Sequence, residues 1–177
     1  MQKHTPRPYA NSDYDRDFNL LYIFVSPTEK QKSGIVKSRV DENSLLTTNL
    51  GIYDIGKDQL SHFFDIGTDK LIRRVYYERS YDAENKRMVF NVEDGHIFNN
   101  HEIEKREKFD VLFILAWNRK EEIFEFWRSS RLGEDKVLLQ TYSEDEKVIP
   151  KIDVFNKKVL FIKKLENKVE VEAFEWK

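Results

Sequence analysis

The sequence predicts a mainly β fold (α+β), in which two short helices at most accompany many short strands. Apolar and aromatic residues come in short runs separated by polar turns, and aromatic residues make up 14% of the chain. There is no alternation of strand and helix patterns of the kind that builds a parallel sheet. Together these observations favour a barrel or a sandwich.

Length and composition indicate one domain. The chain has 177 residues, of which 40% are hydrophobic, which is enough for one core and short for two. The net charge is −2 although 35% of residues are charged, so overall charge gives no sign of a nucleic-acid partner. The absence of cysteine excludes disulfides and thiolate metal sites. We expect residues 1–17 to form a flexible arm and residues 18–177 to form the domain.

The sequence predicts a soluble cytoplasmic protein with no membrane partner. The first residues, MQKHTPRPYANSDYDRDF, lack the apolar core of a secretory signal. The longest nearly uninterrupted apolar run, residues 111–117, has seven residues and is too short to span a bilayer.

The first elements expected are a strand, a long polar loop and a second strand. Residues 18–25, FNLLYIFV, have the length and aromatic content of a buried strand. Residues 27–49 are polar, and loops this long are usually functional or disordered in a compact domain. Residues 50–55, LGIYDI, are typical of a short strand.

A short amphipathic helix is predicted for residues 56–64, GKDQLSHFF. Leu60, Phe63 and Phe64 have the i, i+3, i+4 spacing of one helix face. Gly67 stands where a helix end needs a left-handed residue.

Two hairpins are predicted in the second half of the chain. Residues 70–81 and 86–92 flank the turn-like DAEN, and residues 109–117 and 121–128 flank the charged turn NRK. Further short strands are expected at residues 137–141, 158–162 and 168–174.

Alternation in the strand EEIFEFWR separates two faces. One face carries Ile123, Glu125 and Trp127, and the other carries Phe124, Phe126 and Arg128. An exposed patch formed by Phe124, Phe126 and Trp127 would indicate a protein–protein module, which is one alternative function.

No motif identifies an enzyme, and we predict no catalytic residue and no metal ligand. A Gly-rich phosphate loop, a Gly-x-Ser-x-Gly elbow and paired histidines at helical spacing are all absent from the sequence. His96, His101 and Glu102 lie in one polar stretch, but four ligands are not visible, so solvated loop residues are the favoured interpretation.

A small Mg²⁺-dependent nuclease of the PD-(D/E)xK type with a degenerate active site is the second alternative. Asp65 with Glu78, or Asp110 with Glu125, would supply the two metal-binding acids. Neither pair has a lysine at the expected position, so surface or strand-end carboxylates are the simpler interpretation.

Two basic, polar segments point towards DNA instead. They lie in residues 30–49 and 73–87, where Lys and Arg could neutralise phosphates and Arg, Asn and Lys could bind base edges. Acidic residues in both segments dilute this charge, and two solvated loops are the competing interpretation.

The order of three segments resembles the B3-type DNA-recognition domains of bacterial restriction endonucleases. The segments are LGIYDIGKDQLSHFF, RRVYYERSYDAENKR and FDVLFILAWNRKEEIFEFWRSS, and the resemblance covers residues 18–131. It implies an open pseudobarrel of about seven strands with one or two short helices. It also implies two arms that enter the major groove, here residues 30–49 and 79–87.

The resemblance implies that the chain is the target-recognition domain of a restriction-modification endonuclease. No cleavage module is evident after Arg131, so the nuclease would be a domain or subunit outside this chain, and no cofactor is expected in this one. Lys30, Lys32, Lys37 and Arg74 would contact phosphates. The residues expected to read bases are Arg39, Asn49, Arg79, Asn85, Lys86 and Arg87. The complete set of expected DNA-binding residues is Lys30, Lys32, Ser33, Lys37, Ser38, Arg39, Thr48, Asn49, Arg74, Arg79, Tyr81, Asn85, Lys86 and Arg87.

Overall fold

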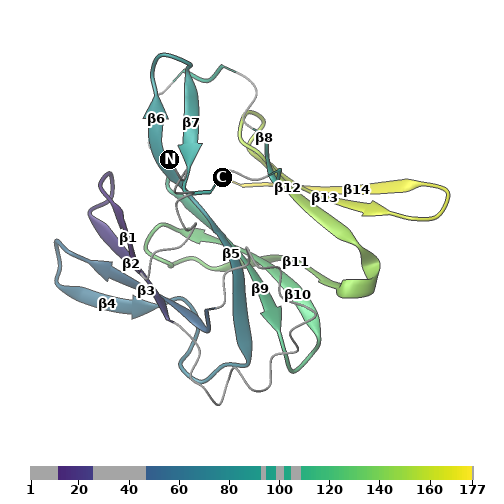
Figure 1. The fold of residues 1–177 in the computed structure, drawn as a ribbon, viewed down its shortest axis with the longest axis horizontal. Coiled ribbons are helices and arrows are strands. Elements are labelled where there is room, and N and C mark those ends of the chain that lie inside the picture. Colours follow the sequence, from purple (N-terminus) through teal and green to yellow (C-terminus); the bar gives the residue numbers. More distant parts are fainter. Residues whose placement is uncertain (1–11, 26–46, 93–94, 99–101, 105–108, 177) are drawn as a thin grey trace, which may run out of the picture.

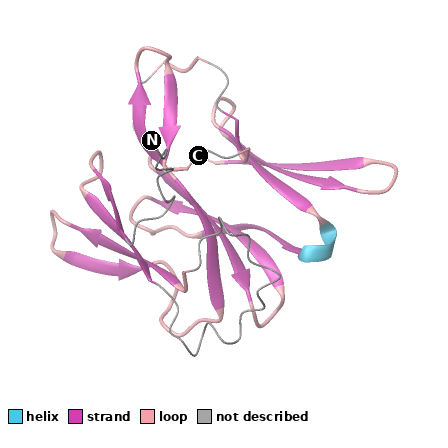
Figure 2. Ribbon diagram, in the orientation of Figure 1, coloured by secondary structure: helices cyan, strands magenta, loops and turns pink. Residues whose placement is uncertain are grey.

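The computed structural model confirms a mainly β fold built from several antiparallel sheets (Figures 1 and 2). It describes residues 12–25, 47–92, 95–98, 102–104 and 109–176. Within these residues three four-stranded sheets and one two-stranded hairpin are present, and no sheet closes into a barrel. No helix among the described residues is long and apolar enough to cross a membrane.

The N-terminal sheet has the order β1-β2-β3-β4. Its strands are β1 (Ser12–Asp15), β2 (Leu20–Val25), β3 (Asn49–Asp54) and β4 (Gln59–His62). The predictions for β2 and β3 are confirmed. However, β1 lies in the segment expected to be a flexible arm, and it pairs with β2 from Ser12↔Ile23 to Asp15↔Leu20.

The predicted helix at residues 56–64 is wrong, because this segment completes a β-hairpin. The Asp54 carboxylate accepts hydrogen bonds from the backbone N–H groups of Gly56 (3.0 Å) and Lys57 (3.2 Å). Asp58 then adopts a left-handed φ of 54°, which closes the turn and starts β4. Leu60 consequently points outward and is 54% exposed, whereas Phe63 is fully buried.

The central sheet has the order β11-β10-β9-β5. Its strands are β5 (Lys70–Tyr76), β9 (Val111–Asn118), β10 (Ile123–Ser130) and β11 (Val137–Ser143). The hairpin predicted around residues 118–120 is confirmed as β9–β10, in continuous register from Asn118↔Ile123 to Val111↔Ser130.

The β9–β10 hairpin is buried on both faces by two separate cores. Leu112 and Ile114 belong to the first core, which packs against the N-terminal sheet through residues such as Ile52. Phe113 and Phe126 belong to the second core, which packs against the C-terminal sheet. Burial on both faces explains why residues 111–117 form a nearly uninterrupted apolar run instead of an alternating one.

The C-terminal sheet has the order β14-β13-β12-β8, in which β8 runs parallel to β12. Its strands are β8 (Ile97–Phe98), β12 (Val148–Asp153), β13 (Lys158–Lys164) and β14 (Val169–Glu175), and a 3-10 turn, η2 (Glu144–Glu146), precedes β12. β13 and β14 were predicted from the sequence, whereas β8 and β12 were not. Pro150 and the charged residues of β12 hide its alternation, although Pro150 and Ile152 face inward.

The remaining strands form a hairpin that projects from the body above the three sheets (Figure 1). β6 (Glu78–Asp82) and β7 (Arg87–Phe90) pair around the predicted turn. β6 follows β5 after one residue, so the predicted strand 70–81 is divided at Tyr77.

Gly133 lies in the turn after β10, and we expect its replacement by alanine to destabilise the fold. Its φ is +74°, and an added Cβ would lie 2.7 Å from Cδ1 of Ile52. The left-handed backbone costs about 1 kcal/mol for a residue with a Cβ, and overpacking adds about 1 kcal/mol. Urea titration should therefore show a loss of about 2 kcal/mol in the free energy of unfolding.

Gly67→Ala is the matched control for Gly133→Ala. Gly67 also has a positive φ, +87°, but an added Cβ there would meet nothing within 4 Å. We expect a loss of about 1 kcal/mol from backbone strain alone. Equal losses in the two variants would show that the contact with Ile52 has no effect.

Candidate nucleic-acid interface

The two predicted DNA-binding arms differ in how far the structure describes them. Residues 26–46 lie outside the described part of the chain, and most of the first arm falls there. The first-arm residues outside the description are Lys30, Lys32, Ser33, Lys37, Ser38 and Arg39.

The described residues on either side of segment 26–46 lie next to each other on the N-terminal sheet, at a place that we call the neck. The backbone N–H of Thr48 donates to the carbonyl oxygen of Val25 (2.9 Å), and the Thr47 hydroxyl lies 2.5 Å from the same oxygen. Thr47 also forms an isolated bridge with Ile72 of β5. The described residues that bound the segment, Val25 and Thr47, are therefore held together, and the half-buried Thr48 lies beside them.

Asn49 is a structural residue, and its predicted role in reading bases is wrong. Its side chain amide donates to the carbonyl oxygen of Phe64 (2.8 Å) and accepts from the backbone N–H of Phe64 (3.0 Å). Asn49 is only 7% exposed, so both of these hydrogen bonds are shielded from water. They fix the end of the β3–β4 hairpin and leave no side-chain edge for a base.

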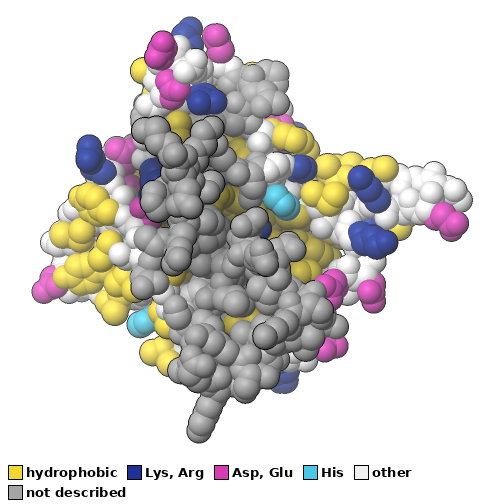
Figure 3. Space-filling view, in the orientation of Figure 1, with side chains coloured by type: hydrophobic (Ala, Val, Ile, Leu, Met, Phe, Trp, Pro, Cys, Tyr) yellow, Lys and Arg dark blue, Asp and Glu magenta, His cyan; other side chains and the backbone are white. Residues whose placement is uncertain are grey.

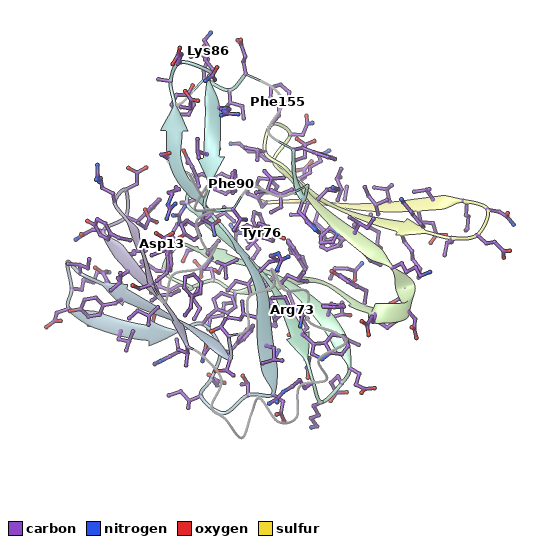
Figure 4. All side chains as sticks on the ribbon, viewed as in Figure 1. Asp13, Arg73, Tyr76, Lys86, Phe90 and Phe155 are labelled. Carbon is purple, nitrogen blue, oxygen red and sulfur yellow. The ribbon has the colours of Figure 1, made fainter. Side chains whose placement is uncertain are left out.

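The second predicted arm is the β6–β7 hairpin, and Lys86 stands at its tip (Figure 4). The Asp82 carboxylate organises the turn: it accepts from the backbone N–H of Asn85 (3.1 Å), from the Asn85 amide (2.8 Å) and from Nε of Arg87 (3.4 Å). The Asn85 hydrogen bonds, more than Arg87, lower the pKa of Asp82. Tyr81 donates its hydroxyl proton to the carbonyl oxygen of Ile103 (2.5 Å), which ties the hairpin to residues 102–104.

Carboxylates accompany every cation of this hairpin. Arg79 pairs with Asp13 (2.6 Å), and Lys86 pairs with Glu104 (3.3 Å) and Glu102 (3.6 Å). The same acids raise the pKa of Lys86, first through the hydrogen bond with Glu104. Acidic and basic side chains consequently intermingle over the hairpin (Figure 3), and its positive charge is smaller than the sequence suggests.

Arg74, the remaining predicted phosphate ligand, lies half-buried on β5. Its Nη1 donates to the carbonyl oxygen of Arg73 (3.0 Å). It thus belongs to the body and not to the projecting hairpin.

The structure does not support either of the carboxylate pairs that the nuclease alternative would need for a metal ion. Glu125 pairs across the hairpin with Ala116, which is six residues from Asp110, a separation of about 20 Å along an extended strand. That pair cannot share a metal ion, so this prediction is wrong. In the other pair, Glu78 is buried and accepts from the backbone N–H of Phe109 (3.1 Å), while Asp65 is exposed.

Histidine and carboxylate positions elsewhere give no metal centre within the described residues, where no group of three or more potential ligands occurs. His96 directs Nδ1 to the carbonyl oxygen of Pro150 (2.9 Å). Glu102 is exposed and pairs with Lys86, and His101 lies outside the described residues.

The aromatic patch of the protein–protein alternative is also wrong as an exposed surface. Phe126 is fully buried in the second core. Trp127 packs edge-on against Phe64 at 5.9 Å, and Phe124 packs against Trp117 at 4.7 Å. The aromatic residues of β10 therefore fill the two cores.

Glu125 has a structural partner that sequence reasoning missed. Lys70 forms an ion pair with it and also lies over the rings of Phe64 (5.1 Å) and Trp127 (4.9 Å). Burial acts to raise the pKa of Glu125, but hydrogen bonds from Lys70, Asn118 and Trp127 outweigh it and lower the pKa. The carboxylate is thus held ionised as part of the packing between β5 and β10.

Arg131 is the largest polar group that the sequence analysis overlooked. It is 2% exposed and forms an ion pair with Asp15, which is 3% exposed. Its guanidinium also donates to the Tyr22 hydroxyl (3.1 Å) and to the carbonyl oxygens of Glu78 (3.0 Å) and Phe109 (3.1 Å). Burial raises the pKa of Tyr22 to about 12, although Arg131 acts to lower it, so this hydroxyl stays protonated at neutral pH.

Comparison with known proteins adds no relative: no protein-family model, no curated protein and no solved structure matches the chain.

Proposed function

We propose that this protein binds double-stranded DNA and that segment 26–46 supplies the contacts to phosphate. The observation that carries the proposal is that segment 26–46 is rich in lysine and arginine and is flanked on both sides by residues that lie together at the neck. Residues 30–40 contain four cations and no acid, and the residues that flank segment 26–46 are joined where the backbone N–H of Thr48 donates to the carbonyl oxygen of Val25. A cation-rich segment anchored at both ends on a β body suits phosphate neutralisation.

The β6–β7 hairpin has a secondary part in this proposal. The turn between its strands lies about twelve residues along the chain from Ile72, the residue that pairs with Thr47 at the neck, which corresponds to roughly 40 Å of extended chain. Base edges or phosphates would have to replace the intramolecular carboxylates that now pair with Arg79 and Lys86. We assign it base contacts through Arg79, Asn85, Lys86 and Arg87, and sequence specificity is the part of the proposal that depends on this exchange.

A nuclease domain or subunit outside this chain, a restriction-modification role and a cytoplasmic location stay predictions from the sequence. The nuclease partner and the restriction-modification role both require a double-stranded DNA partner, so DNA binding is the property to test first.

Fluorescence anisotropy with a labelled random duplex at several salt concentrations tests the proposal. Each neutralised phosphate contributes about −0.9 to the slope of log K against log salt, so four cations predict a slope of about −3 to −4. The variant Lys30→Gln, Lys32→Gln, Lys37→Gln, Arg39→Gln should bring this slope close to zero and weaken binding at low salt by about 100-fold or more.

A charge-matched variant separates local contacts from overall charge. Four exposed lysines away from both arms, Lys57, Lys120, Lys164 and Lys168, are changed to glutamine, which removes the same number of positive charges. This variant should keep most of the slope. Equal losses in the two variants, or no salt-dependent binding by the unaltered protein, would refute the proposal.

A further inference from the structure

A polar groove lies between the edge strand of the central sheet and the C-terminal sheet. Its volume is about 470 Å³, and residues of β11, η2, β12, β13 and β14 line it. The walls include the apolar side chains of Val148, Phe161 and Val171. No residue of the neck or of the β6–β7 hairpin lines this groove, and none of the predicted DNA-binding residues that the structure describes does so either.

The charged residues of the groove leave one carboxylate without a cation. Glu146, Glu170 and Glu172 line it together with a single lysine, Lys163. Lys163 pairs with Glu146 (2.7 Å). Lys168, in the turn between β13 and β14, pairs with Glu170 (2.5 Å). Glu172 accepts a hydrogen bond from the neutral amide of Gln140, and among the described residues no lysine, arginine or histidine forms an ion pair with it.

Tyr142 supplies a second, independent sign of a ligand. It lines the same groove and is only 6% exposed. Its ring packs against Phe124 at 5.4 Å, but its hydroxyl has no hydrogen-bond partner within the part of the chain that the structure describes. Burial raises the pKa of Tyr142, so the hydroxyl stays protonated and keeps both its proton and its lone pairs for a ligand.

We propose that this groove binds an organic cation, a guanidinium or primary ammonium group on an aliphatic stem. Such a group donates hydrogen bonds to the Glu172 carboxylate and to the lone pairs of the Tyr142 hydroxyl. The stem lies against Val148, Val171 and the ring of Phe161, which provide the apolar contact that arginine and lysine side chains seek. The proposal does not depend on DNA binding.

Two probes distinguish the possible sources of the cation. Agmatine is a free guanidinium compound, and a capped Gly-Arg-Gly peptide carries the same group on a polypeptide. Titrations followed by ¹H–¹⁵N NMR should give saturable shifts at the amides of Tyr142 and Glu172. Saturation by both probes supports a small-molecule ligand, and saturation by the peptide alone supports an arginine side chain of a partner protein.

Variants and a neutral isostere make the test specific. Glu172→Gln should weaken binding about tenfold, since a charge-assisted hydrogen bond is lost, and Tyr142→Phe about threefold. Glu175→Gln is the matched control, because Glu175 belongs to the same strand but does not line the groove. The replacement at position 172 can still accept from Gln140, so the fold should be unchanged, and the NMR spectrum of each free variant checks this.

Three results would overturn the proposal. The first is no saturable shift by either probe at concentrations up to about 10 mM. The second is equal affinity for the peptide in which citrulline replaces arginine, because citrulline keeps the shape and loses the charge. The third is an unchanged affinity in Glu172→Gln.

Discussion

Replacing Arg131 by alanine is expected to lower the free energy of unfolding by about 3–5 kcal/mol, the usual loss when one partner of a buried ion pair is removed. The truncation leaves the Asp15 carboxylate, which is 3% exposed, without its cation. It also removes the hydrogen bonds that the guanidinium donates to the carbonyl oxygens of Glu78 and Phe109. Urea denaturation followed by circular dichroism measures the change.

Arg16→Ala is the control for this prediction. Arg16 is exposed in the turn between β1 and β2, and truncation of such a side chain usually changes stability by less than about 0.5 kcal/mol. If Arg131→Ala were as mild as Arg16→Ala, the guanidinium would not join β1 to the end of β10 as we describe. Asp15→Asn should be destabilising as well, because it leaves the buried guanidinium without a counter-charge.

Asn49→Ala is expected to lower the free energy of unfolding by about 2–6 kcal/mol, because it leaves two buried backbone groups of Phe64 without partners. The amide of Asn49 serves both the backbone N–H and the carbonyl oxygen of Phe64. Each unsatisfied buried group costs about 1–3 kcal/mol. Thermal or urea unfolding of the variant measures the loss.

The same variant separates a structural role from a DNA-binding role. Thr48→Ala is the control next to it, since the Thr48 hydroxyl is exposed and makes only a long hydrogen bond to Val25 (3.3 Å). If Asn49→Ala kept full stability but lost binding to duplex DNA, our structural assignment of Asn49 would be wrong.

Local patterns in the sequence were sufficient to predict most strands. The β9–β10 hairpin follows from two apolar runs around a charged turn, and both features lie within twenty residues. The helix prediction failed because Leu60, Phe63 and Phe64 fit a helical period, while the decisive signal was the left-handed Asp58 after the capping Asp54. Such turn chemistry overrides a short apolar spacing.

The candidate interface was less predictable, because its electrostatics depend on partners that are distant in sequence. Arg79 pairs with Asp13, which is 66 residues away, and Arg131 pairs with Asp15 over 116 residues. A count of basic residues in a segment cannot include acids that the fold brings from elsewhere. The β6–β7 hairpin was therefore predicted to be a DNA-binding arm because its sequence is rich in cations. In the folded protein these cations pair with carboxylates, which reduces the positive charge of the hairpin.

The two hydrophobic cores share no residue, and the β9–β10 hairpin lies between them and contributes side chains to both. The outer sheets on either side can therefore loosen independently, while separation of β9 from β10 exposes both cores at once. Amide protons in this hairpin should exchange with solvent most slowly, at rates set by global unfolding. Cooperativity between the two halves of the molecule thus depends on sixteen residues of paired strand.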